Sequence, residues 1–308
     1  MISLGAPVTA GIVSLGGAGT YELSGVPAFT LNSGVAGVPA FAAVTSGTHS
    51  VSAPILLASP LVVDVPAGSR LTVGSVRTAT GSPTTNGVTV GGGGTLAIRG
   101  TYVGGAITIE NNGAAMGARV YTSFVDLGTS SAIVRGANAG SAAANVASLR
   151  DAVRAWSTAS GGLPGTVGLG SSDAFYTAAG AFTTIGVYSN AAGGISMFAG
   201  QSVGTTDVLV RYTYLGDTDL SGSVDASDLS RALQGLSGAG TGWKFGDVNY
   251  DGLIDTVDLG RVIAALRGQG APLGDAGGLP GGAIPEPSSL AVLATASAVL
   301  VRWGRDRR

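Results

Sequence analysis

Short apolar runs separated by glycine, serine, proline and asparagine make up most of the chain as far as residue 126. The runs are rich in β-branched residues, and they include 61–65, 71–76, 88–90, 95–98 and 106–109. Apolar and small polar positions alternate within them, which predicts β-strands, whereas the 3.6-residue period of an amphipathic helix is absent. We therefore expect a mainly β structure for this part of the chain.

Two of these segments repeat each other at an offset of 25 residues. The matching positions are Val63, Val65, Gly68, Leu71 and Val73 in one copy and Val88, Val90, Gly93, Leu96 and Ile98 in the other. A partial third copy begins at Ile107. Repeats of this length suit a parallel β-solenoid, in which stacked coils bury a continuous aliphatic core, and a β-sandwich is the alternative. The segment resembles the autotransporter-associated β-repeats of passenger-type surface proteins.

Residues 127–215 differ in pattern from the repeats before them. The stretch from Ala143 to Trp156 predicts a helix, with Val146, Leu149, Val153 and Trp156 on one face. Strands are expected at 119–127, 181–188 and 207–214. This region resembles the segment that follows such repeats in planctomycete-type surface proteins, and the resemblance implies that it caps the solenoid.

A 12-residue pattern of acidic and small polar residues occurs twice between residues 216 and 268. The first copy, D-T-D-L-S-G-S-V-D-A-S-D, begins at Asp217, and the second, D-V-N-Y-D-G-L-I-D-T-V-D, begins at Asp247. Each copy is followed by apolar residues with helical spacing, namely Leu229, Leu233 and Leu236 and then Leu259, Ile263 and Leu266. Two amphipathic helices that pack against each other are therefore expected.

Positions 1, 3, 5, 7, 9 and 12 of both copies have the spacing of the oxygen ligands in an EF-hand calcium loop, with glycine at position 6 for the turn. The predicted ligands are Asp217, Asp219, Ser221, Ser223, Asp225 and Asp228 in the first loop, and Asp247, Asn249, Asp251, Leu253, Asp255 and Asp258 in the second. Ser223 and Leu253 would contribute backbone carbonyls. Carboxylates this dense repel one another unless a cation fills the cluster, so two calcium ions are predicted. A pair of surface turns that bind nothing is the alternative.

The apolar residues at position 8, Val224 and Ile254, predict a short β-bridge between the two loops. The tandem pattern resembles the type I dockerin family, whose G-D-x-N-x-D-G-x-[IV]-[ND]-x-x-D-L motif is matched by Gly246 to Leu259 and more loosely by Gly216 to Leu229. The resemblance implies a small all-α module that holds two calcium ions.

In the dockerin family, the contacts with a cohesin lie at loop positions 10 and 11. The residues at these positions are Ala226, Ser227, Thr256 and Val257. They differ from the Ser-Thr pairs usual in cellulosomal dockerins. The resemblance to dockerins implies a cohesin-like partner. Because the residues at positions 10 and 11 differ from the usual pairs, an intramolecular partner is the alternative.

The carboxyl-terminal residues comprise a Gly/Pro-rich linker, 269–283, and a three-part tail, 284–308. The tail contains the triplet Pro285, Glu286 and Pro287, an apolar run from Ser288 to Val301, and the arginines Arg302, Arg305, Arg307 and Arg308. This order resembles the PEP-CTERM sorting signal, which implies recognition by an exosortase-type sorting enzyme. The positive-inside rule places the arginines in the cytoplasm, with the apolar run as a helix in the membrane before processing. A hydrophobic helix that packs on the body is the alternative.

Composition narrows the function classes. Charged residues make up 11% of the chain, against about 25% in average proteins, and the net charge is −2, so no nucleic-acid partner is expected. The absence of cysteine excludes disulfides and thiolate metal sites. The single histidine, His49, is expected to be a solvated loop residue. No signal peptide is visible after Met1, although the tail requires export, so we expect the true start to lie upstream.

A catalytic role is not expected, because no motif surrounds the acidic residues before residue 216. These are Glu22, Asp64, Glu110, Asp126, Asp151, Asp173 and Asp207, and solvated or capping roles are expected for them. A glycosidase would need two of them facing each other across a cleft. We expect an exported, non-catalytic protein of the cell envelope or matrix. The alternative is a dockerin-bearing component of a polysaccharide-degrading assembly, with polysaccharide as a candidate partner.

The sequence thus predicts five parts. They are a β-repeat solenoid region at 1–126, a β-rich capping region with one helix at 127–215, a dockerin-like calcium module at 216–268, a linker at 269–283 and a sorting signal with a hydrophobic helix at 284–308.

Overall fold

The computed structural model describes residues 2–17, 19–25, 27–114, 119–158, 165–175, 181–192 and 194–273. These residues belong to one compact unit. The proposed sorting tail, including Pro285, Glu286, Pro287 and the four arginines, lies outside the described residues, as does its apolar helix. Within the described ranges, no helix combines the length and hydropathy needed to cross a membrane.

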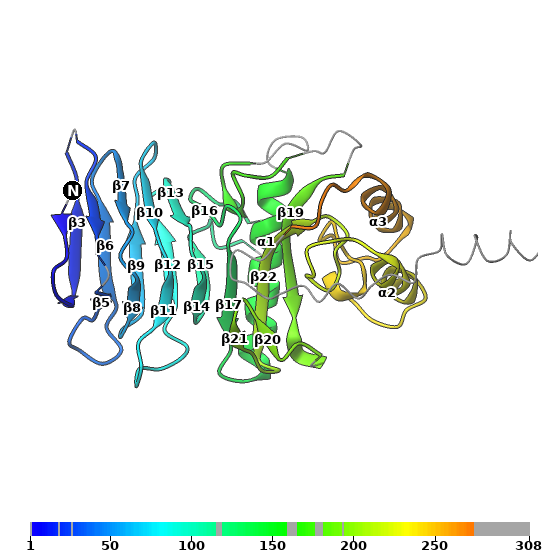
Figure 1. The fold of residues 1–308 in the computed structure, drawn as a ribbon, viewed down its shortest axis with the longest axis horizontal. Coiled ribbons are helices and arrows are strands. Elements are labelled where there is room, and N and C mark those ends of the chain that lie inside the picture. Colours follow the sequence, from blue (N-terminus) through cyan, green and yellow to red (C-terminus); the bar gives the residue numbers. More distant parts are fainter. Residues whose placement is uncertain are drawn as a thin grey trace, which may run out of the picture. The chain divides into compact units, whose positions relative to one another are not determined.

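The chain winds through three sheets in turn and adds one strand to each sheet per coil (Figure 1). The first sheet contains β1 (Ile2–Ser3), β4 (Glu22–Ser24), β7 (Thr48–Val51), β10 (Arg70–Val73) and β13 (Thr95–Ile98). The second contains β2 (Val8–Ala10), β5 (Phe29–Leu31), β8 (Ile55–Leu57), β11 (Val76–Thr78) and β14 (Tyr102–Gly104). The third contains β3 (Ile12–Leu15), β6 (Ala40–Val44), β9 (Leu61–Asp64), β12 (Val88–Gly91) and β15 (Ile107–Ile109).

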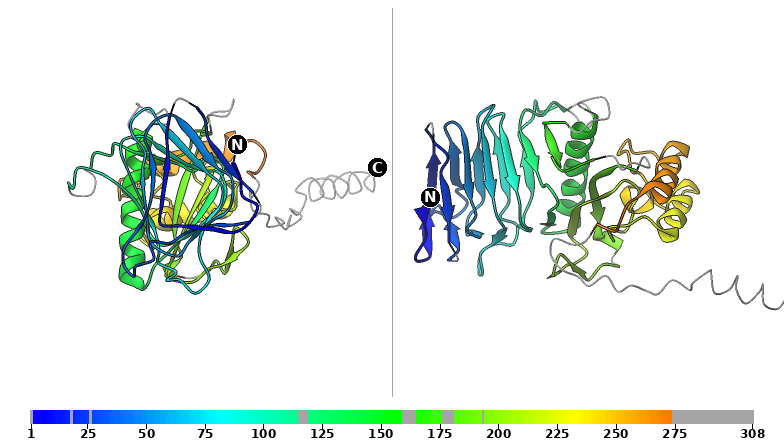
Figure 2. Two further views of the ribbon diagram at one scale, coloured as in Figure 1. Left: turned by 90° about the vertical axis from the view of Figure 1, so that its left-hand side faces the viewer. Right: turned by 45° about the horizontal axis from the view of Figure 1, so that its top comes forward.

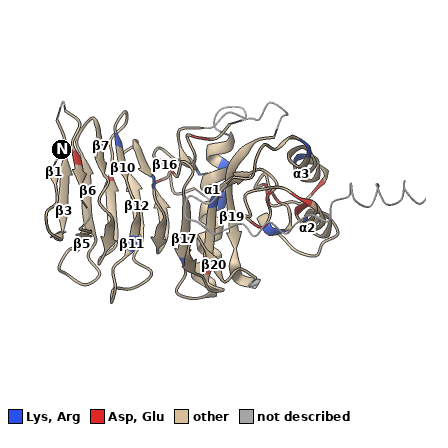
Figure 3. Cartoon of the chain, in the orientation of Figure 1, with Lys and Arg blue, Asp and Glu red and all other residues tan. Residues whose placement is uncertain are grey.

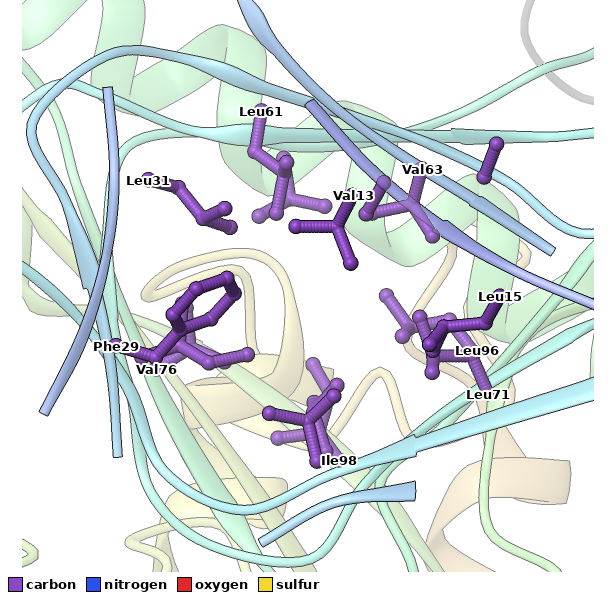
Figure 4. A pocket seen from close by; sticks show the side chains of 16 residues that line it. Val13, Leu15, Phe29, Leu31, Leu61, Val63, Leu71, Val76, Leu96 and Ile98 are labelled. Atoms are coloured by element: carbon purple, nitrogen blue, oxygen red, sulfur yellow. The ribbon is translucent and has the colours of Figure 1, made fainter. Parts of the chain in front are cut away.

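All neighbouring strands in these coils run parallel. The coiled, parallel arrangement is that of the predicted solenoid and not of an antiparallel sandwich. Alternate side chains point inward, so that Val88 and Val90 are buried while Thr89 between them is half-buried. Figure 4 shows the interior, where aliphatic side chains from all three sheets meet. Each such buried side chain stabilises the fold by about 1.5–3 kcal/mol.

The predicted repeat is confirmed in the first sheet and shifted in the third. Leu71 pairs with Leu96, as an offset of 25 residues requires. Val63, however, pairs with Val90 and not with Val88. The corner between β9 and β10 is two residues longer than the corner between β12 and β13. Because side chains alternate with a period of two, a two-residue shift leaves the inward-facing pattern unchanged.

His49 is fully buried in β7, so its expected place in a solvated loop is wrong. Its Nδ1 accepts a hydrogen bond from the backbone N–H of Tyr21 at 3.1 Å, and its Nε2 lies 2.7 Å from the carbonyl oxygen of Ser46. The ring also stacks on Tyr21. Both ring nitrogens therefore contact backbone groups of nearby chain segments, and a neutral ring protonated on Nε2 satisfies both contacts.

A further group of elements follows the fifth coil and covers it (Figures 1 and 2). It comprises β16 (Phe124–Asp126), β17 (Ser131–Arg135), α1 (Ala139–Thr158), β18 (Gly168–Gly170), β19 (Thr183–Ser189), η1 (Asn190–Ala192), β20 (Met197–Phe198), β21 (Gln201–Ser202) and β22 (Asp207–Tyr214). β22 pairs antiparallel with both β17 and β19, which ends the parallel order of the second sheet. The predicted helix lies within α1, where Leu149, Val153 and Trp156 are buried.

Asp126, Asp151 and Asp207 are buried, so of the two expected roles, solvated or capping, the solvated one is wrong for these three acids. Asp126 accepts hydrogen bonds from Arg70 and Arg99, each at 2.6 Å. Asp207 accepts from Arg135 at 3.0 Å, and Asp151 accepts from the hydroxyl of Tyr121 at 3.0 Å. Each buried carboxylate is thus compensated by a donor from a distant part of the chain.

Three helical elements follow β22. They are α2 (Ala226–Leu236), η2 (Trp243–Phe245) and α3 (Thr256–Gly268). The two 12-residue loops run into the first turns of α2 and α3, and acidic residues gather beside these helices (Figure 3). β22 therefore leads from the end of the coils straight into the predicted metal-binding region.

Candidate metal centre

The first loop brings three carboxylates together. Asp217, Asp219 and Asp228 each offer an oxygen, and the three oxygens lie within 4.8 Å of one another. Asp217 is fully buried, and its Oδ1 and Oδ2 accept hydrogen bonds from the backbone N–H groups of Ser221 at 2.9 Å and Gly222 at 2.7 Å. The loop thus folds around its first carboxylate. Such a cluster of hard oxygen donors fits a calcium ion.

The other predicted ligands of the first loop lie at its edge. The hydroxyl of Ser221 lies 3.4 Å from Asp217 Oδ1 and donates to the backbone carbonyl of Ser223 at 3.1 Å. Asp225 instead accepts a hydrogen bond from the backbone N–H of Ser227 at 2.6 Å. The predicted set of six therefore divides into a central triad, a neighbouring serine pair and an aspartate that starts the next helix.

Loop positions 9 and 12 also form the amino-terminal caps of the two helices. Asp225 and Asp228 make a capping box at α2, and Asp255 and Asp258 make the same box at α3. The backbone N–H of Asp225 donates to Asp228 Oδ2 at 2.8 Å, and that of Asp255 donates to Asp258 Oδ2 at 3.2 Å. This second role was not predicted, although the D-x-x-D spacing before each apolar stripe is a capping signal.

Electrostatics in the first loop favour a bound cation. Burial raises the pKa of Asp217 well above its ordinary value, and the nearby Asp228 carboxylate raises it further. Burial also raises the pKa of Asp228 to about 6. Burial alone would raise the pKa of Asp219, but Arg231, whose NH1 lies 2.6 Å from Asp219 Oδ2, lowers it. A bound cation would stabilise the charged form of these buried carboxylates, which burial and mutual repulsion disfavour.

The second loop is arranged differently. Asp247 is buried, and its Oδ2 forms an ion pair with Arg150 of α1, while its Oδ1 is buried without a hydrogen-bond partner. Asn249 Oδ1 accepts from the backbone N–H of Asp251 at 2.8 Å, and Asp251 Oδ1 accepts from that of Leu253 at 2.8 Å. Over the described ranges, the acids of this loop do not meet in a triad like that of the first loop. A cation would supply the partner that Asp247 Oδ1 lacks.

The backbones of the two loops match at two turning positions. Leu220 and Tyr250, at position 4, have φ of 60° and 61°, and Gly222 and Gly252, at position 6, have φ of 93° and 89°. Left-handed backbone at a leucine and a tyrosine is uncommon, so its recurrence 30 residues apart marks one loop conformation built twice. The two loops therefore share the backbone turns of one calcium-loop conformation, and their oxygen-bearing residues would suit a calcium ion.

The expected β-bridge between Val224 and Ile254 is not formed. Instead, the side-chain amide of Gln269 accepts a hydrogen bond from the backbone N–H of Val224 at 2.7 Å and donates to its carbonyl oxygen. An amide side chain carries the donor and acceptor of a peptide group, so it replaces a strand partner. Gln269 belongs to the segment assigned to a linker, and this contact packs it against the first loop.

The buried faces of the two helices consist mainly of small residues and not of the predicted leucine stripe. Leu233 and Leu236 are 48% and 41% exposed, whereas Ala232, Gly235, Val262 and Ala265 are buried. A Cβ at Gly246 would lie 2.9 Å from Ala232, and one at Gly216 would lie 3.1 Å from Val262. Each loop thus packs closely on the helix that follows the other loop. The helical period was predicted correctly, but in each helix the buried residues precede the predicted ones by one position.

Comparison with known families agrees with this twofold arrangement. Residues 215–267 match the dockerin type I domain. Domains of this family bind calcium and typically bind cohesins. No curated protein and no solved structure matches the chain.

The dockerin module is joined to the free edge of β19 by Tyr250. The hydroxyl of Tyr250 accepts a hydrogen bond from the backbone N–H of Val187 and donates to the carbonyl oxygen of Ile185, both at 2.8 Å. The ring of Tyr250 stacks on Trp243, whose Nε1 donates to the carbonyl oxygen of Asp217 at 2.7 Å. A continuous series of contacts therefore connects the sheet edge, the second loop and the first loop.

β22 makes further contacts with the dockerin module and with the residues after α3. Arg211 donates to the carbonyl oxygens of Leu220 and Leu273. The hydroxyl of Tyr214 donates to the carbonyl oxygen of Ala271 at 3.0 Å and accepts from the backbone N–H of Gly270 at 3.1 Å. The described end of the chain is therefore bound to the second sheet.

Proposed function

We propose that the chain is a non-catalytic, calcium-binding surface protein that carries its dockerin module on a rigid β-coil. The carboxylate triad of Asp217, Asp219 and Asp228 carries this proposal, together with the unpaired buried oxygen of Asp247. We infer two ions, one per loop, because the turning positions of both loops share one backbone conformation. Millimolar extracellular calcium would keep such loops filled.

The residues that would contact a cohesin-like partner are exposed to solvent. Ala226, Ser227, Thr256 and Val257 at loop positions 10 and 11 are all exposed, Val257 by 53%. Tyr250, in contrast, faces β19 and is buried. The module therefore offers one face to its own coil and another to a second protein. Because these four residues are small and only one is apolar and branched, we infer a partner surface that differs from those of cellulosomal cohesins.

The buried acids support a structural role for the coil. Asp126 is committed to two arginines and Asp207 to Arg135, so neither is available as a general acid or nucleophile. We propose that export and the sorting tail, read by an exosortase-type enzyme, bring this structure to the cell envelope.

A role in a polysaccharide-degrading assembly is the second candidate, supported by a groove of about 640 Å³ beside the second sheet. Its lining includes Arg77, Thr78, Thr101 and Gln201, which could hydrogen-bond to sugars. Aromatic residues, on which sugar rings stack, are absent from its described lining. Affinity electrophoresis in gels containing neutral and acidic polysaccharides tests this candidate, and unchanged migration in all of them would exclude it.

Calcium titration of the full chain by calorimetry tests the main proposal. We expect two bound ions in the wild type and one in each of the variants Asp217→Asn and Asp247→Asn. The control is Asp64→Asn, which removes an exposed carboxylate at the end of β9 and should still bind two ions. A wild-type titration without binding heat, and without a calcium-dependent change in circular dichroism, would refute calcium binding.

A further inference from the structure

Arg150 is a residue of the body that enters the second calcium loop. It lies on α1, 97 residues before Asp247, and its NH2 forms an ion pair with Asp247 Oδ2. Its guanidinium also lies 5.9 Å from the centre of the Tyr250 ring. The arginine side chain is 24% exposed and the aspartate side chain 1%. The first ligand position of this loop is therefore in contact with a cation that the dockerin module does not supply.

The first loop obtains its positive charge from within the module. Arg231 of α2 approaches Asp219 and Asp228, at 2.6 Å and 3.8 Å. The equivalent residue in the second half, 30 positions later, is Arg261, which is exposed. Position 3 of the second loop is Asn249, which offers no negative charge to Arg261. The two halves thus differ in the origin of the cation that faces their carboxylates.

The two oxygens of Asp247 have different surroundings. Oδ2 faces Arg150, whereas Oδ1 is buried and accepts no hydrogen bond. A carboxylate can bind an arginine with one oxygen and a calcium ion with the other. An arginine this close to a divalent ion would nevertheless repel it.

We propose that Arg150 is a built-in counter-cation that shares Asp247 with calcium. Its positive charge weakens calcium binding in the second loop and keeps that loop attached to α1 when the ion is absent. This inference rests on the proposed calcium binding. The calcium affinity of the second loop would therefore depend on Arg150, a residue of α1 that lies outside the dockerin module.

Calorimetry on the full-length variants Arg150→Gln and Arg261→Gln tests this role. Both remove one positive charge near the second loop, but only the first removes the ion pair with Asp247. We expect Arg150→Gln to tighten one of the two calcium-binding steps on the order of tenfold, because repulsion of a divalent ion is relieved. Arg261→Gln should change neither step by more than about twofold, as expected for an exposed and screened charge.

Thermal unfolding in chelator supplies the second readout. Without calcium, Arg150→Gln should lower Tm by several degrees relative to Arg261→Gln, because Asp247 loses its ion pair with Arg150, and calcium should remove most of that difference. If both variants bind two calcium ions with the same affinities, the role of Arg150 is overturned and the proposed calcium binding still stands. Absence of calcium binding in the wild type would overturn both this inference and the proposed function.

Discussion

Asp126 shows how a single buried side chain connects several coils. It ends β16 and is fully buried, and its oxygens accept hydrogen bonds from Arg70 of β10, from Arg99 and from the backbone N–H and hydroxyl of Ser172. Burial alone would raise the pKa of Asp126, but these donors, led by Arg99, lower it well below its ordinary value. The charged carboxylate is therefore the form that the fold stabilises.

The variant Asp126→Asn should lower the free energy of unfolding by about 3 kcal/mol at neutral pH, because it leaves two arginines without their shared carboxylate. Since the folded pKa lies below the ordinary value of about 3.9, the contribution is complete above about pH 4 and is lost as the pH falls toward the folded pKa. Urea unfolding at pH 7, 5 and 3 measures this. The exposed Asp64→Asn is the control, and a difference from wild type that did not shrink at pH 3 would contradict the prediction.

Sequence identified the residues of the calcium loops better than the residues that hold the body together. Asp217 and Asp228 stand in a local pattern of 12 positions, and so the spacing alone predicted that they would meet. Asp126 meets Arg70 and Arg99 from 56 and 27 residues away. No local pattern encodes that contact, because it depends on the register of stacked coils. The contact of Arg150 with Asp247 was not predicted either, because it joins residues 97 positions apart and no local pattern encodes it.

At the level of elements, the two helices of the dockerin module depend on close approach between loops and helices. Gly246 has φ of 97° and lies so near Ala232 that no side chain fits between them. Sequence periodicity predicted the helices because apolar residues recur every three or four positions. It placed the centre of the buried face one residue too far along each helix, because leucines are larger and more apolar than the alanine and glycine that are buried, and Leu229, Leu259 and Leu266 are only partly buried.

The variant Gly246→Ala should destabilise the chain by about 2 kcal/mol more than Gly238→Ala does. Both place an alanine at positive φ, 97° and 86°, but only the first pushes a methyl group into a neighbouring helix, since nothing lies within 4 Å of the Gly238 position. Chemical denaturation monitored by circular dichroism gives the two values. Equal losses would show that backbone strain, and not packing, requires Gly246.

At the level of the whole described molecule, coil and dockerin module share one buried core. The repeated alternation of apolar residues was enough to predict parallel coils, because every coil imposes the same inward pattern. The attachment of the module was not predictable, because Tyr250 stands at position 4 of its loop, which is not a ligand position, and its partner strand lies more than 60 residues away. Its hydroxyl pairs with β19 only when the folded sheet presents an unpaired edge.

Removal of calcium should therefore change hydrogen exchange outside the two loops as well. We expect a chelator to increase the hydrogen exchange of the β19 amides, including Val187, because Tyr250 is held by the second loop. Amides of β9 and β12, in the middle of the coils, should keep their protection. Hydrogen exchange with mass spectrometry measures both regions. An increase confined to residues 215–273 would show that module and coil respond independently.

The position of β22 has a mechanical consequence. This strand is paired with β17 at five positions and with β19 at seven, and it continues directly into the first calcium loop. A pull on the module, applied along the strand, would load both ladders in shear, so that many hydrogen bonds must break together instead of one after another. Tension from a bound partner would thus enter the molecule through the centre of three paired strands and not through a flexible tether.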